Sequence, residues 1–201
     1  MVRLVEIEIS EELLRGASAG DETAQVVVYT ATAPATFALI RRLIANRAVA
    51  EDLFQETMMA LFERLPQFRR EAPLGAWLRQ IAVSRCLMYL RSPWHRARLH
   101  LESDAEVDIP HALSALVTPA PAVESFDVER ALASLSPTAR AVVWLYEVEG
   151  YSHQEIAQLF GRSASFSKSQ LARAHVRLRE WFEPSEGRHT CTSIQSNGKV
   201  L

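Results

Sequence analysis

The apolar residues of this 201-residue chain recur three or four positions apart over most of its length. That spacing lines up side chains along one face of an α-helix. It predicts two groups of helices, on either side of an acidic stretch that contains Pro110, Pro119 and Pro121. The expected helices cover residues 10–20, 21–44, 49–65, 74–91, 126–135, 136–150, 152–160 and 163–183. The pattern therefore favours an all-α fold, with two helical modules joined by a linker.

Capping residues and prolines set the expected helix ends in the first group. Ser10 is a good N-cap, and Pro34 predicts an interruption or restart because proline lacks an amide hydrogen. The run from Val26 to Tyr29 has strand propensity, but its helical neighbours favour a helix. Residues 49–65 form an amphipathic helix with Leu53, Met58 (or Thr57), Leu61 and Leu65 on its apolar side. The helix of residues 74–91 is expected to bury Trp77, Leu78, Ile81, Leu87 (or Ser84) and Met88.

In the second group, Ser136 and Pro137 mark the start of a helix, since proline is favoured at the first helical position. This helix is expected to end at Gly150. Its predicted buried side is Val142 or Val143, Leu145 and Val148.

The stretch from Tyr151 to Arg179 predicts two helices joined by a tight turn. Ser152 and Glu155 form the sequence pattern of a capping box, and Gly161 stands where a left-handed residue would end the first helix. Ser163 or Ser165 then caps a second helix, whose expected inward face is Leu171, Ala174 or His175, and Leu178. Two short helices around a glycine turn are typical of a helix-turn-helix.

From Arg162 to Arg179 the sequence carries basic residues and no acid, namely Arg162, Lys168, Arg173, Arg177 and Arg179. In a helix-turn-helix the start of the second helix enters the major groove, and basic residues further along the helix bind DNA phosphates. The charge pattern therefore indicates that this helix binds DNA. A solvated basic face on a purely structural hairpin is the alternative.

Charge is segregated along the chain although its net value is only −2. Residues 68–100 hold seven arginines and one acid, whereas residues 101–129 hold seven acids and no Lys or Arg. Two basic blocks around an acidic linker indicate two nucleic-acid contacts on separate modules. In the first block aromatic residues interleave with arginines, which suits unpaired bases that stack on rings. The polar residues 184–201 lack periodicity and are expected to be mostly disordered.

Other classes of protein have little support. No apolar run approaches the length of a membrane span, and the N-terminal residues lack the order of a signal peptide, so a cytoplasmic protein is expected. Cys86 and Cys191 have no metal-ligand spacing, and His153 with Glu155 is too close for a helical zinc pair. With no glycine-rich phosphate loop or G-x-S-x-G, no enzyme activity, cofactor or metal is predicted.

Four segments, in order, resemble the extracytoplasmic-function (ECF) sigma factors, the smallest bacterial promoter-recognition subunits. They are A-E-D-L-F-Q-E-T at 50–57, F-R-R-E-A-P-L-G-A-W-L-R-Q-I-A at 68–82, A-L-A-S-L-S-P-T-A-R-A-V-V at 131–143 and E-V-E-G-Y-S-H-Q-E-I-A-Q-L-F-G at 147–161. The resemblance implies sigma domain 2 at 10–98, an acidic linker at 99–125 and sigma domain 4 at 126–183. The implied partners are core RNA polymerase, promoter DNA both as duplex and as melted single strand, and an anti-sigma factor.

The resemblance also implies residue roles. The polymerase-binding positions are Asp52, Gln55 and Glu56. The positions that melt and read the minus-ten element are Phe68, Arg69, Arg70, Trp77, Arg79, Ser84 and Arg85. The positions that read the minus-thirty-five element are Ser165, Phe166, Lys168, Ser169, Gln170 and Arg173.

Some of these positions depart from the family pattern. Relatives commonly have Asn where Ser84 stands and Arg where Gln170 stands, so the promoter sequence is not transferable from them. The alternative function is a helix-turn-helix regulator that acts on DNA without being a polymerase subunit.

Overall fold

Every regular element among the described residues is a helix, as the apolar spacing predicts. The computed structural model describes residues 3–92, 128 and 130–182, which form module one (residues 3–92) and module two (residues 130–182). Module one contains η1 (Leu4–Glu6), α1 (Glu11–Ser18), α2 (Glu22–Leu43), α3 (Arg47–Arg64), η2 (Leu65–Gln67) and α4 (Leu74–Arg91). Module two contains α7 (Pro137–Val143), the π-helical turn η4 (Trp144–Val148), α8 (His153–Phe160) and α9 (Ala164–Phe182). The predicted linker and tail lie outside the described residues.

Capping explains most of the helix starts in module one. Ser10 accepts a hydrogen bond from the amide of Leu13, and Asp21 accepts from Thr23 and Ala24 at the start of α2. Asn46 caps α3 in the same way. These side chains satisfy amides that have no partner inside the helix.

Pro34 does not interrupt the second helix, so that prediction was wrong. Helix α2 runs unbroken from Glu22 to Leu43 with Pro34 exposed inside it. On its buried side Val28, Thr32 and Ile40 pack in the core. This packing holds the helix together across the hydrogen bond that proline removes.

Helix α2 is the one described helix that is long and apolar enough, by length and composition, for a membrane span, with a mean hydropathy of 1.3. In the structure it packs beside α1, α3 and α4 in module one. Its residues Val28, Leu39, Ile40 and Leu43 are buried there. Packing in module one accounts for the apolar residues on this side of the helix.

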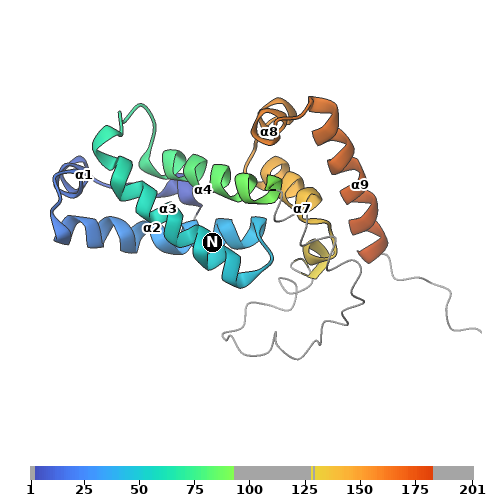
Figure 1. Ribbon diagram of the computed structural model, residues 1–201, viewed down its shortest axis with the longest axis horizontal. Helices are drawn as coiled ribbons and strands as arrows, with labels where there is room; N and C mark the ends of the chain where they lie inside the picture. The colour runs from blue at the N-terminus through green and yellow to red at the C-terminus, as the bar shows by residue number, and fades with distance from the viewer. Residues whose placement is uncertain (1–2, 93–127, 129, 183–201) are drawn as a thin grey trace, which may run out of the picture.

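The two modules lie side by side, with α4 running toward α7 and α8 (Figure 1). Their buried side chains form one connected apolar cluster, which extends from Leu4 and Leu78 in module one to Leu145 and Ile156 in module two. The described parts of the chain are therefore packed together rather than held apart.

Two predicted core positions are exposed. Met88 is 60% exposed, because Leu87 and Leu90 occupy the buried side of α4. Val148 is 39% exposed although Val142, Val143 and Leu145 are buried as expected. The π-helical turn explains Val148, since one extra residue per turn moves the following positions out of the α-helical phase.

Candidate nucleic-acid interface

The helix-turn-helix of module two is built from the predicted caps. Ser152 accepts from the amide of Glu155, whose carboxylate accepts from the amide of Ser152 at 2.8 Å. Hydrogen bonds from the side chain and from the backbone of Ser152 lower the pKa of the Glu155 carboxyl below its ordinary value of 4.5. Gly161 has φ 61° and ends α8 in the left-handed region, where a side chain would be strained. Helix α9 begins at Ala164, so Ser163 stands at the position before it.

Helix α9 presents a continuous polar face to solvent. Ser165, Lys168, Ser169 and Arg173 are exposed and follow one another at helical spacing. Phe166 and Gln170 are half-buried. The ring of Phe166 packs 5.6 Å from that of Phe160 on α8, which leaves part of it accessible. The structure thus brings four of the six predicted minus-thirty-five positions onto one exposed face.

Two histidines fix this helix to the rest of module two. The ring of His153 stacks 4.4 Å from Tyr146, and its Nδ1 lies 3.0 Å from the hydroxyl of buried Ser167. The Nε2 atom of His175 lies 3.0 Å from a carboxylate oxygen of Glu147. Of the two alternatives for the inward face, Ala174 is buried and His175 is exposed. These contacts orient α9 through α8 and the π-helical turn.

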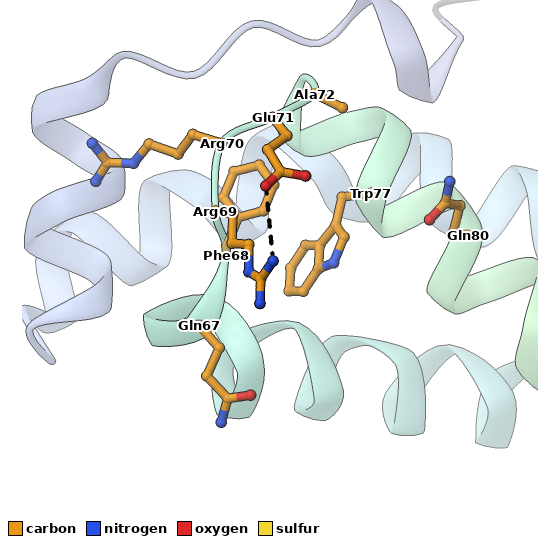
Figure 2. A pocket seen from close by; sticks show the side chains of 8 residues that line it. All are labelled: Gln67, Phe68, Arg69, Arg70, Glu71, Ala72, Trp77 and Gln80. Carbon is orange, nitrogen blue, oxygen red and sulfur yellow. Dashed lines mark ion pairs between the residues drawn. The ribbon is translucent and has the colours of Figure 1, made fainter.

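The loop between α3 and α4 forms a pocket in module one. The pocket has a volume of about 370 Å³ and is lined by Gln67, Phe68, Arg69, Arg70, Glu71, Ala72, Trp77 and Gln80. Figure 2 shows the rings of Phe68 and Trp77 side by side, and their centroids lie 4.9 Å apart. Arg70 has φ 58°, an uncommon backbone conformation for a residue other than glycine. Four predicted minus-ten positions therefore line one cavity, with aromatic surface and positive charge together.

The other predicted minus-ten positions lie along α4. Ser84 is exposed, and Arg85 is half-buried with its Nη1 2.7 Å from a carboxylate oxygen of Glu56. The side chain of Arg79 is only 20% exposed. Its Nη1 donates to the backbone carbonyl of Glu149 in module two at 2.9 Å. Module two therefore covers one of the arginines that was predicted to face DNA.

The predicted polymerase-binding residues share one exposed face of α3. Asp52, Gln55 and Glu56 all point to solvent, while Leu53 and Thr57 are buried behind them. The ion pair from Glu56 to Arg85 joins this acidic face to α4. Their role stays a prediction, as do the DNA roles of the residues above.

Sequence reasoning missed the residues that join the two modules. Arg140 is 7% exposed and donates to the backbone carbonyls of Arg42 at 2.7 Å and Arg41 at 3.1 Å. Arg3 donates to the carbonyl of Val148 at 2.8 Å. A bond to a backbone carbonyl distant in the sequence leaves no spacing signal, so the sequence pattern could not reveal these contacts. Within residues 3–92 and 130–182, no group of three or more His, Cys, Asp or Glu could hold a metal ion.

Comparison with known families supports both modules separately. The family model for sigma-70 region 2 matches residues 28–96, and that for sigma-70 region 4 matches residues 125–178. The first match covers the α3–α4 pocket and the second covers the helix-turn-helix. Their order along the chain is the order that the resemblance implied.

Similar curated proteins span both regions. The ECF RNA polymerase sigma factor SigM of Mycobacterium tuberculosis is 32% identical over 168 residues, which are 83% of this chain and 81% of SigM. A probable RNA polymerase sigma factor, RfaY of Xanthomonas campestris, is 31% identical over 169 residues. That match covers 81% of this chain but only 41% of RfaY, so the chain spans less than half of that relative.

A solved structure has a similar fold. It is the sigma factor RpoE of Bartonella quintana in complex with the anti-sigma factor NepR. The two chains are 28% identical with a TM-score of 0.53, over 76% of this chain and 92% of the other.

Proposed function

This chain belongs to the ECF family of RNA polymerase sigma factors, and we propose how its two modules divide the work of that family. It binds core RNA polymerase and directs promoter-specific transcription initiation, and sigma factors are not themselves enzymes. The observation that carries this function is the pair of family matches, one on each module and in the expected order. In the proposal, residues 10–98 act as sigma domain 2, residues 99–125 as the linker and residues 126–183 as sigma domain 4.

Module two reads the minus-thirty-five element as duplex. The exposed side chains of Ser165 and Ser169 are short hydrogen-bonding groups near the start of α9, where a recognition helix meets base edges. Lys168 and Arg173 on the same face neutralise phosphates. Phe166 and Gln170 contribute less directly to contacts with the duplex, because both side chains are half-buried.

Module one captures the melted minus-ten strand. A base that leaves the duplex needs an aromatic surface to stack on and positive charge for its phosphates. The pocket supplies both, through the adjacent rings of Phe68 and Trp77 and the guanidinium of Arg69, whose Nη1 lies 3.9 Å from a carboxylate oxygen of Glu71 (Figure 2). The backbone of Arg70 lines the same pocket, while its side chain is directed away from the two rings. Exposed Ser84 continues this surface along α4. Arg79 and Arg85 add positive charge to that helix, although both are engaged in the free chain.

The acidic face of α3 docks on the polymerase. Asp52, Gln55 and Glu56 are exposed in one row on α3. The family resemblance implies that this helix binds the clamp helices of the largest polymerase subunit. A matched pair of variants isolates this face. Asp52→Lys reverses a charge within it, whereas Glu63→Lys makes the same change at an exposed position near the end of the same helix. The first is expected to reduce core binding and the second to leave it unchanged.

The protein works in the cytoplasm, where core polymerase and the chromosome are, and an anti-sigma factor controls it. The similar sigma factor of Bartonella quintana was solved with such a partner.

Run-off transcription with purified core polymerase and genomic DNA fragments tests the function. New discrete start sites in the presence of the protein are the expected result, and they would define both promoter elements. Sequence-specific DNA binding without new transcripts would instead favour a regulator that acts without polymerase. Binding to neither core polymerase nor DNA would refute the proposal.

A further inference from the structure

Three arginines from two helices line a small cavity near the C-terminal end of α2. The cavity has a volume of about 200 Å³ and is lined by Ala38, Arg41 and Arg42 of α2 together with Arg140 of α7. The described residues that line it include no Asp or Glu. None of the proposed promoter or polymerase positions is among them, so the cavity is separate from the sites described above.

Backbone carbonyls and an aromatic ring hold the three guanidinium groups in place. Arg140 is 7% exposed and donates to the carbonyls of Arg42 at 2.7 Å and Arg41 at 3.1 Å. The Nη1 atom of Arg41 donates to the carbonyl of Ala45 at 2.6 Å. The guanidinium carbon of Arg42 lies 5.2 Å from the centre of the Trp144 ring. A carbonyl or a ring orients a guanidinium group without removing its charge, so three positive groups are fixed around one cavity.

The positive charge at this place exceeds what the end of the helix requires. The last carbonyls of a helix together carry about half a unit of negative charge, which one basic side chain offsets. Three guanidinium groups bring about three positive charges. Capping of α2 therefore explains the hydrogen bonds of Arg41 and Arg140, but among the described residues it leaves an excess of about two positive charges around the cavity.

We propose that this cavity binds a phosphate group. Phosphate carries more than one negative charge, and its oxygens bind a guanidinium group in pairs, so it matches several arginines better than a carboxylate or chloride does. The group belongs either to a free phosphoanion such as pyrophosphate or to a nucleic-acid backbone, which share this chemistry. The proposal uses none of the promoter contacts, so failure of the protein to start transcription would not affect it.

Titration of the full-length chain with pyrophosphate tests the site, by calorimetry and by thermal unfolding in buffer without divalent cations. The chain's own acidic residues at 101–129 compete with the added anion in this experiment, which makes the test stringent. A ligand that binds only the folded chain lowers the unfolding equilibrium constant about 100-fold at 100 times its Kd. Acetate at the same ionic strength is the control for a general effect of salt, and it should give no comparable stabilisation.

Two variants at Ala38 test the cavity without altering any arginine. Ala38→Glu adds a carboxylate to the lining, whereas Ala38→Gln adds a neutral side chain of similar size and helix propensity. The carboxylate should weaken pyrophosphate binding at least about tenfold relative to the Gln variant, because it repels the anion. Without pyrophosphate, the Glu variant should unfold at a higher temperature than the Gln variant, because its carboxylate offsets the positive charge.

A change at one of the arginines tests the direct contact. Arg41→Gln removes one of the three guanidinium groups and should weaken pyrophosphate binding about tenfold. Arg64→Gln is the matched control, because Arg64 is the exposed last residue of α3 and does not line the cavity. It removes an arginine from a helix end in the same way and should leave the affinity for pyrophosphate unchanged.

A labelled duplex of random sequence identifies the source of the phosphate group. Weaker duplex binding by Ala38→Glu than by Ala38→Gln would assign the cavity to a nucleic-acid backbone. Equal duplex binding, with pyrophosphate binding lost only in the Glu variant, would assign it to a free phosphoanion. The proposal would be refuted if pyrophosphate did not bind the wild-type chain, if acetate stabilised the chain equally, or if the two Ala38 variants bound pyrophosphate with equal affinity.

Discussion

Gly75 is the position where a single methyl group should have the largest effect outside the apolar core. It lies in the first turn of α4, directly under the N-terminal segment that contains η1. A Cβ atom at this position would lie 1.8 Å from the carbonyl oxygen of Leu4 and 2.8 Å from its carbonyl carbon. Both are backbone atoms, so Gly75→Ala must push the N-terminal segment away from α4.

The expected cost follows from what that segment contributes. Re-exposing Leu4, which is 5% exposed in the structure, costs about 1.5–3 kcal/mol. Loss of the bond from Arg3 to Val148 costs about 0.5–1 kcal/mol more, because this bond is exposed to solvent. Alanine offsets about 0.5–1 kcal/mol of this destabilisation, since its helix propensity is higher than that of glycine. The net destabilisation should be about 2 kcal/mol.

Urea unfolding followed by circular dichroism measures this change, and a truncation supplies the control. Removing residues 1–9 removes the segment that the methyl group displaces. In the truncated chain Gly75→Ala should therefore be neutral, or stabilising by up to about 1 kcal/mol. An equal loss in the full-length and truncated chains would show that the cost arises within α4 and would refute this reasoning.

Four further predictions concern the capping box and the two proposed DNA surfaces. The pKa of the Glu155 carboxyl is lowered in the folded chain, so its ionised form stabilises the fold at pH values above the ordinary pKa of 4.5. That stabilisation is lost as the pH falls through the folded-state pKa. The thermal unfolding midpoints of the wild type and Glu155→Gln should therefore converge in acid, and a difference that stays constant with pH would contradict this. Ser152→Ala should cost about 1 kcal/mol in urea unfolding, because it removes the other half of the box; no loss would mean that the box contributes nothing. Lys168→Ala and Arg173→Ala should each weaken minus-thirty-five binding on all sequences and reduce the salt slope by about 1, and a sequence-dependent loss at constant slope would instead indicate base contacts. Trp77→Ala should slow promoter opening, measured by permanganate footprinting, more than it weakens duplex binding, and equal effects would argue against base stacking in the pocket.

Local sequence signals predicted most of the helices and the exposed face of α9 well. Ser152, Glu155 and Gly161 act within a few residues of the chain, so their types alone identify the turn of the helix-turn-helix. Helix α4 begins and ends at the predicted Leu74 and Arg91 for the same reason. The exposed row from Ser165 to Arg173 follows from the helical period once the buried Leu171 and Ala174 are known.

Features that depend on tertiary packing were not predictable in this way. Pro34 is tolerated because a long helix is buried on its opposite side, which propensity does not measure. Val148 was assigned to the core because an α-helical period was assumed through the π-helical turn. Arg79 and Arg140 bind backbone carbonyls, and a carbonyl has no residue type that a sequence pattern could recognise.

The π-helical turn from Trp144 to Val148 also indicates how chains of this kind could diverge in length. A π-helical turn holds about one residue more than an α-helical turn, so deleting one residue here would restore the ordinary helix and leave the elements that follow close to their present orientation. By contrast, deleting one residue from a regular α-helical turn would rotate everything that follows by about 100°. A one-residue change in length is therefore tolerated at this turn without reorienting α9, which the same change within α7 would not allow.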